Sequence, residues 1–124
     1  MLLESILALQ LILYQPIHRD NDILEANIRT EIMPKIGYCE SRYEGMKAWN
    51  ANDGKIGAHS IGKYQWQVES WNDWTRYYGL KNYDIINEAN QDDLTLRVIA
   101  DGQMKKLWKV CSTPEMLAKE IGSY

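Results

Sequence analysis

The sequence contains no phenylalanine, only two histidines and two cysteines, and no long basic run. Metal sites need clustered ligands, whereas His18 and His59 are isolated and neither cysteine belongs to a CxxC pair, so no metal site is predicted. Because the formal net charge is only −3, nucleic acid is not expected as a partner. A phosphate-binding glycine motif and a GxSxG nucleophile motif are also missing, and no cofactor is expected.

Residues 1–14 are apolar but lack the features of a complete targeting or membrane-spanning segment. No Lys or Arg precedes Arg19, whereas a signal peptide has a basic n-region, and Glu4 and Gln10 interrupt the apolar run. The run is also shorter than the roughly 20 residues that span a bilayer. It predicts a helix packed on the domain and ended by Pro16, with a shortened export or anchor segment as the alternative. Membrane association is expected only through this segment.

The aromatic residues are 8 Tyr and 5 Trp. Their side chains combine an apolar face with a polar edge, which suits stacking on sugars and also suits packing in a small core. Four of the five tryptophans lie between Trp49 and Trp74, which modestly favours a sugar-binding groove. Cys39 and Cys111 are compatible with one disulfide, which would indicate an oxidising compartment, and equally with two free buried thiols.

Helix signals cover most of the chain of 124 residues, which predicts one mainly helical α+β domain. The cluster Asp20-Asn21-Asp22 predicts the start of a helix that runs to about Ile32, and Pro34 suits the first turn of the next helix. A buried stripe is expected on these helices because four residues follow helical spacing, namely Ile32, Ile36, Cys39 and Tyr43.

Later helices are predicted from their caps. One runs from about Glu69 to Tyr78, with Val68, Trp71, Thr75 and Tyr78 on its inner face, and Gly79 ends it. The next begins at a capping Asn90. A last short helix follows the N-cap Thr113 and ends at Gly122.

Residues 45–62 carry four glycines and the turn signal Asn52-Asp53-Gly54. An Asp-Gly pair favours a hairpin turn because both central residues can take positive φ. We therefore expect a small glycine-rich lobe in which Lys47–Asn50 pairs with Lys55–Ala58. The short aromatic segment Tyr64-Gln65-Trp66 follows this lobe.

Glu40 is the candidate for acid catalysis. It lies near the end of a predicted helix, one step around from Cys39, at the border of the core, where partial burial favours a protonated carboxyl. Cleavage of a glycosidic bond needs such a proton donor near pH 7. Glu44 and Asp53 are the nearest carboxylates in sequence for a second catalytic role, and the sequence assigns neither. A surface glutamate paired with Arg42 is the plain alternative.

An ordered set of short segments resembles the transglycosylase-like domain of resuscitation-promoting factors and, more widely, soluble lytic transglycosylases and lysozymes. The set consists of Cys39-Glu40-Ser41, Asn50-Ala51-Asn52-Asp53-Gly54, Gly62-Lys63-Tyr64-Gln65-Trp66 with Ser70-Trp71, and Trp108-Lys109-Val110-Cys111. The chain departs from the family pattern at Lys63, Trp66 and Lys109, and it lacks the Tyr-Asn-Ala-Gly segment of the larger transglycosylases. The resemblance divides the chain into an N-terminal helical extension, 1–35, and a lysozyme-like domain, 36–124.

The resemblance implies a lysozyme-like fold and a role for each matching residue. Glu40 is implied as the catalytic acid, and Cys39 and Cys111 as a disulfide. The implied substrate-binding residues are Gln65, Tyr64, Trp66, Asn52 and Trp71. The implied activity is lytic transglycosylase cleavage of peptidoglycan glycan strands between N-acetylmuramic acid and N-acetylglucosamine, outside the cytoplasmic membrane. We expect the protein to be a monomer.

Three other functions stay open at the level of sequence. A lysozyme-type hydrolase would use the same acid with water as the acceptor. A non-catalytic peptidoglycan-binding module would keep its affinity after Glu40→Gln. A small structural protein would bury Tyr64, Gln65 and Trp66 and have no cleft.

Overall fold

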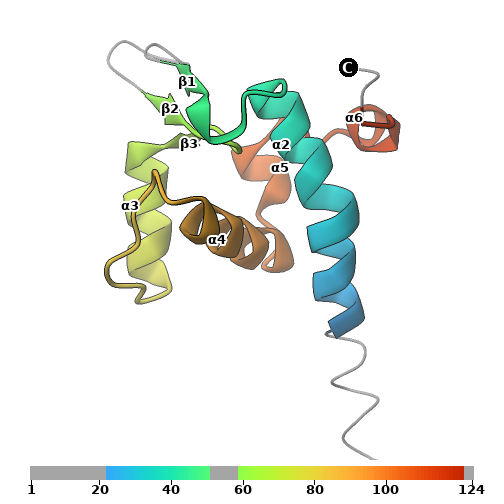
Figure 1. Cartoon of the computed structure of the whole chain (residues 1–124). Coiled ribbons are helices and arrows are strands. Elements are labelled where there is room, and N and C mark those ends of the chain that lie inside the picture. The colour runs from blue at the N-terminus through green and yellow to red at the C-terminus, as the bar shows by residue number, and fades with distance from the viewer. Residues whose placement is uncertain (1–21, 51–58, 122–124) are drawn as a thin grey trace, which may run out of the picture.

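The computed structural model describes residues 22–50 and 59–121, and it is mainly helical with a small antiparallel sheet, as predicted (Figure 1). The predictions for residues 1–21, and those for Asn52, Asp53 and 55–58, lie outside the described residues. The helices are α2 (Met33–Ser41), α3 (Val68–Tyr77), α4 (Glu88–Ala100), α5 (Met104–Leu107) and α6 (Pro114–Ala118). The strands are β1 (Trp49–Asn50), β2 (Ser60–Ile61) and β3 (Trp66–Gln67). No helix in the described ranges is long and apolar enough to cross a membrane.

The first helical segment runs without a break into α2. Residues 22–27 are α-helical, a π-helical turn, η1 (Ile28–Ile32), follows, and α2 then starts with Pro34 in its first turn, as predicted. Proline has no N–H and its ring crowds the carbonyl four residues earlier, so a helix adjusts around it. Here the Met33 N–H donates to the Ile28 carbonyl, which is the wider π-type spacing.

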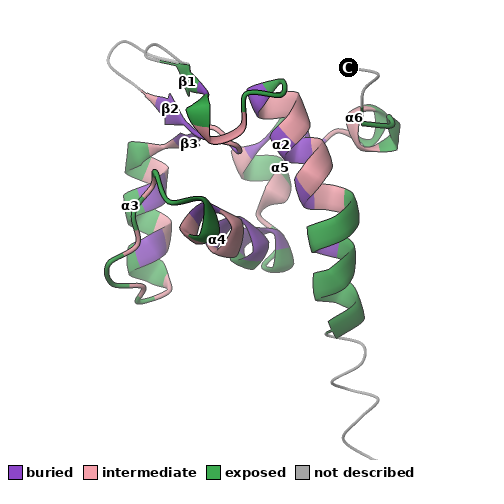
Figure 2. Ribbon diagram, viewed as in Figure 1, coloured by how far each residue is buried: buried purple, intermediate pink, exposed green. Residues whose placement is uncertain are grey.

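The core begins before the predicted domain start at residue 36. Ile28 and Met33 are only 2% and 4% exposed and belong to the same apolar cluster as the residues of α4. Residues 22–27 are exposed (Figure 2). The helical segment from Ile28 onward is therefore part of the packed domain and not a separate extension.

The predicted stripe on α2 is correct only in part. Ile36 is fully buried, and Ile32 and Cys39 are half-buried. Tyr43 is 66% exposed because α2 ends at Ser41, and Arg42 and Tyr43 both take left-handed φ angles. A residue beyond the helix end no longer follows the helical period, so its spacing does not place it on the buried face.

The sheet has the order β1-β2-β3, with both pairs antiparallel. Trp49 pairs with Ile61 and Asn50 with Ser60, so the partner of the first strand lies later in the chain than the predicted Lys55–Ala58. Both residues of β2 are buried. Burial against the core, which the turn signal does not report, accounts for this choice of partner.

Tryptophan side chains occupy the centre of the core. The Trp66 ring lies 5.6 Å from Trp71 and 5.4 Å from Trp108, both in edge-to-face geometry. Each of two indole N–H groups finds a partner: Trp66 donates to Thr95 Oγ1 at 2.9 Å and Trp108 to the Tyr64 carbonyl at 2.8 Å. These tryptophans therefore hold the β3 strand, α4 and the chain after α5 together.

The later helices agree with their predicted positions, apart from the start of α4, the end of α6 and the side chain of Val68. Gly79, with φ +66, follows α3, although Val68 at the start of α3 is 40% exposed and not on the inner face. The N-cap of α4 is Asn87, whose side chain accepts from the Asn90 N–H, so the predicted cap at Asn90 is wrong. Thr113 caps α6 as predicted, and this helix ends at Ala118, before the predicted Gly122.

Candidate functional site

A pocket of about 980 Å³ lies between the end of α2, the β3 region and the chain from α5 to α6. Its lining from the α2 end consists of Tyr38, Cys39, Glu40, Arg42 and Tyr43. Its lining from the turn before β3, from β3 itself and from α3 consists of Gln65, Trp66, Gln67 and Ser70. Its lining from the last part of the chain consists of Lys106, Leu107, Trp108, Lys109, Val110, Cys111, Met116 and Lys119.

Glu40 is half-buried in the last turn of α2 and lines this pocket. The helix end is well defined, because the Arg42 N–H donates to the Tyr38 carbonyl at 2.9 Å and the Ser41 hydroxyl donates to the Gly37 carbonyl at 2.7 Å. Among the residues that the structure describes, Glu40 is the only carboxylate in the lining, and Glu44 does not reach it. The structure thus presents one acidic group to the pocket from a rigid element.

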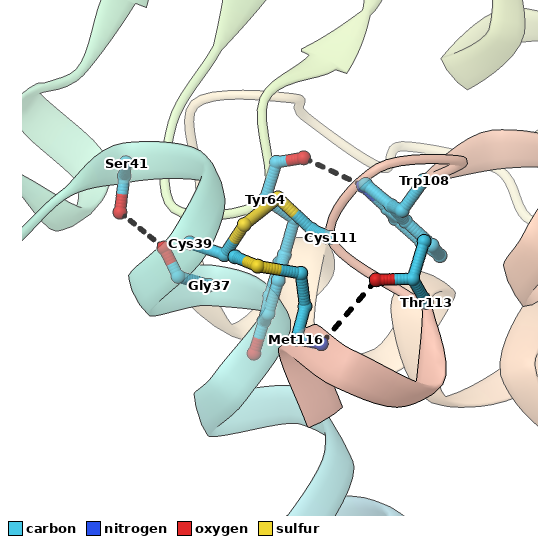
Figure 3. The surroundings of a disulfide bond; sticks show 8 residues. All are labelled: Gly37, Cys39, Ser41, Tyr64, Trp108, Cys111, Thr113 and Met116. Atoms are coloured by element: carbon cyan, nitrogen blue, oxygen red, sulfur yellow. Dashed lines mark hydrogen bonds between the residues drawn. A yellow bond between two sulfur atoms is a disulfide. The ribbon is translucent and has the colours of Figure 1, made fainter. Parts of the chain in front are cut away.

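A disulfide joins Cys39 to Cys111, which confirms the pairing that the family resemblance implies. The two Cα atoms are 5.7 Å apart and the residues are separated by 72 positions in sequence. The bond links the last turn of α2 to the chain between α5 and α6, next to the Thr113 cap (Figure 3). Two walls of the pocket are therefore covalently connected beside Glu40.

Gln65 lines the pocket from the turn between β2 and β3. Its φ is +53, an uncommon left-handed value for a residue other than glycine. The turn is closed by its backbone N–H and its side-chain Nε2, which both donate to the Gly62 carbonyl, at 3.1 and 2.9 Å. A strained backbone held in this way at a pocket wall is typical of functional positions.

The fully buried Gln91 of α4 packs against the same turn and holds it by hydrogen bonds. Its Nε2 donates to the carbonyls of Ile61 and Ile85, at 3.0 and 2.6 Å. Gly62 lies against this amide with φ +80, and a Cβ added there would come within 2.4 Å of Gln91 Nε2. Only glycine fits both the conformation and the space, so α4 fixes where Gln65 stands.

Three of the predicted substrate-binding residues are buried core residues. Tyr64 and Trp71 are each 3% exposed and are not in the pocket lining, so both are corrected from groove residues to packing residues. Trp66 is 2% exposed and contributes only to the pocket wall. Their large apolar surfaces are covered by the core, which prevents a sugar from stacking on them. The predicted Asn52 lies outside the described residues.

The structure adds pocket residues that the sequence did not single out. The Tyr38 and Tyr43 rings contact each other edge to face, with centroids 3.8 Å apart, and the exposed Tyr43 ring is free of the core. Val110 is 72% exposed at the same pocket. The sequence gives little sign of this surface, because it arises from the left-handed residues that end α2.

The pocket combines a carboxylate, an amide, exposed aromatic surface and several cations. Such a set can deliver a proton, hydrogen-bond and stack a sugar, and attract an anionic group. Within the part of the chain that the structure describes, no three His, Cys, Asp or Glu side chains gather to hold a metal ion. Comparison of the chain with family models, curated proteins and solved structures finds no match.

Proposed function

We propose that the protein is a lytic transglycosylase with a lysozyme-like fold, which cleaves the β-1,4 bond between N-acetylmuramic acid and N-acetylglucosamine in peptidoglycan. The observation that carries the proposal is that Glu40, on the last turn of α2, shares one pocket with Gln65 and the exposed Tyr43 ring. A general acid, a hydrogen-bonding amide and an aromatic surface are the groups that binding and cleaving a glycan strand require.

In this proposal Glu40 acts first as an acid and then as a base. Its carboxyl gives a proton to the glycosidic oxygen, and the bond from that oxygen to the muramoyl C1 breaks. The resulting carboxylate accepts the proton of the muramoyl C6 hydroxyl, whose oxygen bonds to C1 and forms a 1,6-anhydro end. One carboxylate suffices for both steps, which suits a pocket whose described lining contains Glu40 alone as an acid.

The Cys39–Cys111 disulfide supports a location outside the cytoplasmic membrane. Disulfides form and persist in oxidising compartments and are rare in the cytosol. Peptidoglycan is also extracytoplasmic, so the bond and the proposed substrate agree on the compartment.

The test is digestion of purified peptidoglycan, with the released muropeptides identified by mass spectrometry. We expect wild type to release 1,6-anhydro products and Glu40→Gln to lose at least about a hundredfold in rate, the usual effect of a general acid or base. Glu44→Gln is the matched control, because Glu44 is exposed and outside the pocket lining.

Each other outcome would assign a different function or mechanism to the protein. Products with reducing ends, lost in Glu40→Gln, would mean a lysozyme-type hydrolase. Binding of glycan without release by a folded wild type would mean a non-catalytic peptidoglycan-binding module. Release that Glu40→Gln leaves unchanged would remove Glu40 from the mechanism.

A further inference from the structure

The charge of the pocket is opposite in sign to that of the chain. The whole sequence has a formal net charge of −3. The described pocket lining, in contrast, holds one carboxylate, Glu40, together with the cations Arg42, Lys106, Lys109 and Lys119. The cations come from the end of α2, from α5, from the chain after α5 and from the end of α6, so the fold and not the local sequence gathers them.

Three of these cations have no anionic partner among residues 22–50 and 59–121, namely Arg42, Lys106 and Lys109. Cations on the α3 and α4 side are instead neutralised: Lys63 pairs with Asp92 at 2.8 Å and Arg97 with Asp93 at 2.9 Å. Like charges around one concave surface focus a positive potential into it. The positive potential of the pocket therefore favours binding of an anion.

The backbone of an N-acetylated glycan strand offers no such anion, because its sugars are uncharged. In peptidoglycan the carboxylates belong to the peptide stem, which is attached to the lactyl group of the muramoyl residue. In the proposed function Glu40 acts at the muramoyl linkage, so the stem would be attached to a sugar bound in this same pocket. The three cations lie on that same pocket surface, and Arg42 is only two residues from Glu40.

We propose that Arg42, Lys106 and Lys109 form an anion subsite that binds the peptide-stem carboxylates of the muramoyl residue next to the scissile bond. The inference rests on the proposed function and deepens it: the substrate is glycan that still carries its acidic stems, not bare or neutralised glycan. Stem recognition works through charge, so it weakens as salt screens the cations.

The experiment measures binding apart from turnover, in the full chain carrying Glu40→Gln. The probes are a peptidoglycan tetrasaccharide with intact peptide stems and the same compound with its stem carboxyls converted to amides. Isothermal titration calorimetry at low and at physiological salt gives the dissociation constants. The test variant adds Lys106→Gln and Lys109→Gln, which are exposed positions. The matched control adds Lys105→Gln, the exposed α5 lysine beside Lys106 that is outside the pocket lining.

We expect the intact stems to bind more tightly than the amidated stems at low salt. The double lysine variant should weaken intact-stem binding by roughly fivefold, since each exposed charge pair contributes a fraction of a kcal/mol, and should leave amidated-stem binding unchanged. Lys105→Gln should behave like its parent. Equal affinity for the two probes, or equal weakening by the Lys105 control, would overturn the stem subsite.

Two further arms separate the remaining explanations. In the first arm, a glycerol phosphate polymer competes for binding to the pocket. If this polymer binds and the intact stems show no carboxylate-dependent binding, the stem assignment is overturned and the cations are assigned to a phosphate polymer. A wild type that cleaves no peptidoglycan, with carboxylate-dependent binding retained, would overturn the proposed activity while supporting the anion subsite.

Discussion

The side chain that precedes Gln65 shows how a residue outside the pocket can fix one inside it. The Tyr64 hydroxyl donates to Asp92 Oδ1 at 2.6 Å, and Lys63 Nζ lies 2.8 Å from the same oxygen. Burial raises the pKa of Tyr64, and the hydrogen bond to Asp92 raises it further. Burial lowers the pKa of Lys63, but the bonds to Asp92 and Glu88 outweigh it and leave this pKa raised. This network ties the turn before Gln65 to α4.

Tyr64→Phe tests this network, because it keeps the buried ring and removes only the hydroxyl. We expect a loss of about 1 kcal/mol in the free energy of unfolding at pH 7, the usual net effect of one hydrogen bond. The pKa of Tyr64 is raised in the folded state, so the hydroxyl contributes its full stabilising effect below the pKa of the unfolded chain, near pH 10. At higher pH the unfolded chain ionises first, and this stabilisation is lost. Urea unfolding from about pH 7 to 11 measures both effects.

We expect the free energies of unfolding of wild type and Tyr64→Phe to converge at alkaline pH. Tyr77→Phe is the control, because Tyr77 is 72% exposed and its hydroxyl has no partner among the described residues. If the free energies of unfolding of wild type and Tyr64→Phe instead run parallel across the whole pH range, the Asp92 contact contributes no pH-dependent stability.

At the scale of elements, the turn between β2 and β3 depends on one glycine. Gly62→Ala would force an L side chain into φ +80 and bring its Cβ against the buried Gln91 amide. We expect about 2–4 kcal/mol of destabilisation from left-handed strain together with disturbed buried hydrogen bonds. Gly79→Ala is the matched control, since Gly79 has φ +66 but nothing within 4 Å, and it should lose only about 1 kcal/mol. Thermal unfolding compares the two, and equal losses would mean that the Gln91 contact is easily relieved.

Elements with local signals could be predicted from the sequence. Thr113-Pro114 and Gly79 specify the ends of helices through their own backbone chemistry, and the structure has these ends where expected. The start of α4 differs from the prediction because Asn87 and Asn90 are equally good caps in isolation. The partner of β1 differs from the prediction because burial of the two β2 residues favours this register, and the turn signal does not report burial.

The candidate site could be predicted only at residues whose position is set by the local sequence. Glu40 follows from its place at the end of a helix, whereas the aromatic residues do not reveal which face they cover: Tyr64 and Trp71 turn inward and Tyr43 turns outward. Counting cysteines left the disulfide open, and only the family resemblance supplied the pairing. The cations of the pocket converge from separate helices, which no local pattern reports.

At the scale of the whole molecule, the disulfide connects an early helix to the last part of the chain. The sheet, α3, α4 and α5 all lie in sequence between Cys39 and Cys111. Closing a loop of this size restricts the unfolded chain strongly, by about 4 kcal/mol in the chain-entropy model. Domains of this kind are stable by roughly 5–15 kcal/mol in total, so the bond supplies a large part of that margin.

The double variant Cys39→Ser with Cys111→Ser should therefore lose about 4 kcal/mol in the free energy of unfolding, measured by urea unfolding. Wild type treated with a reductant should fall to the same stability, and the double variant should not respond to the reductant, which serves as the control. Because the bond joins two walls of the pocket beside Glu40, we also expect weaker glycan binding before global unfolding begins. A variant as stable as wild type would show that noncovalent packing in the core alone holds the two ends of the domain together.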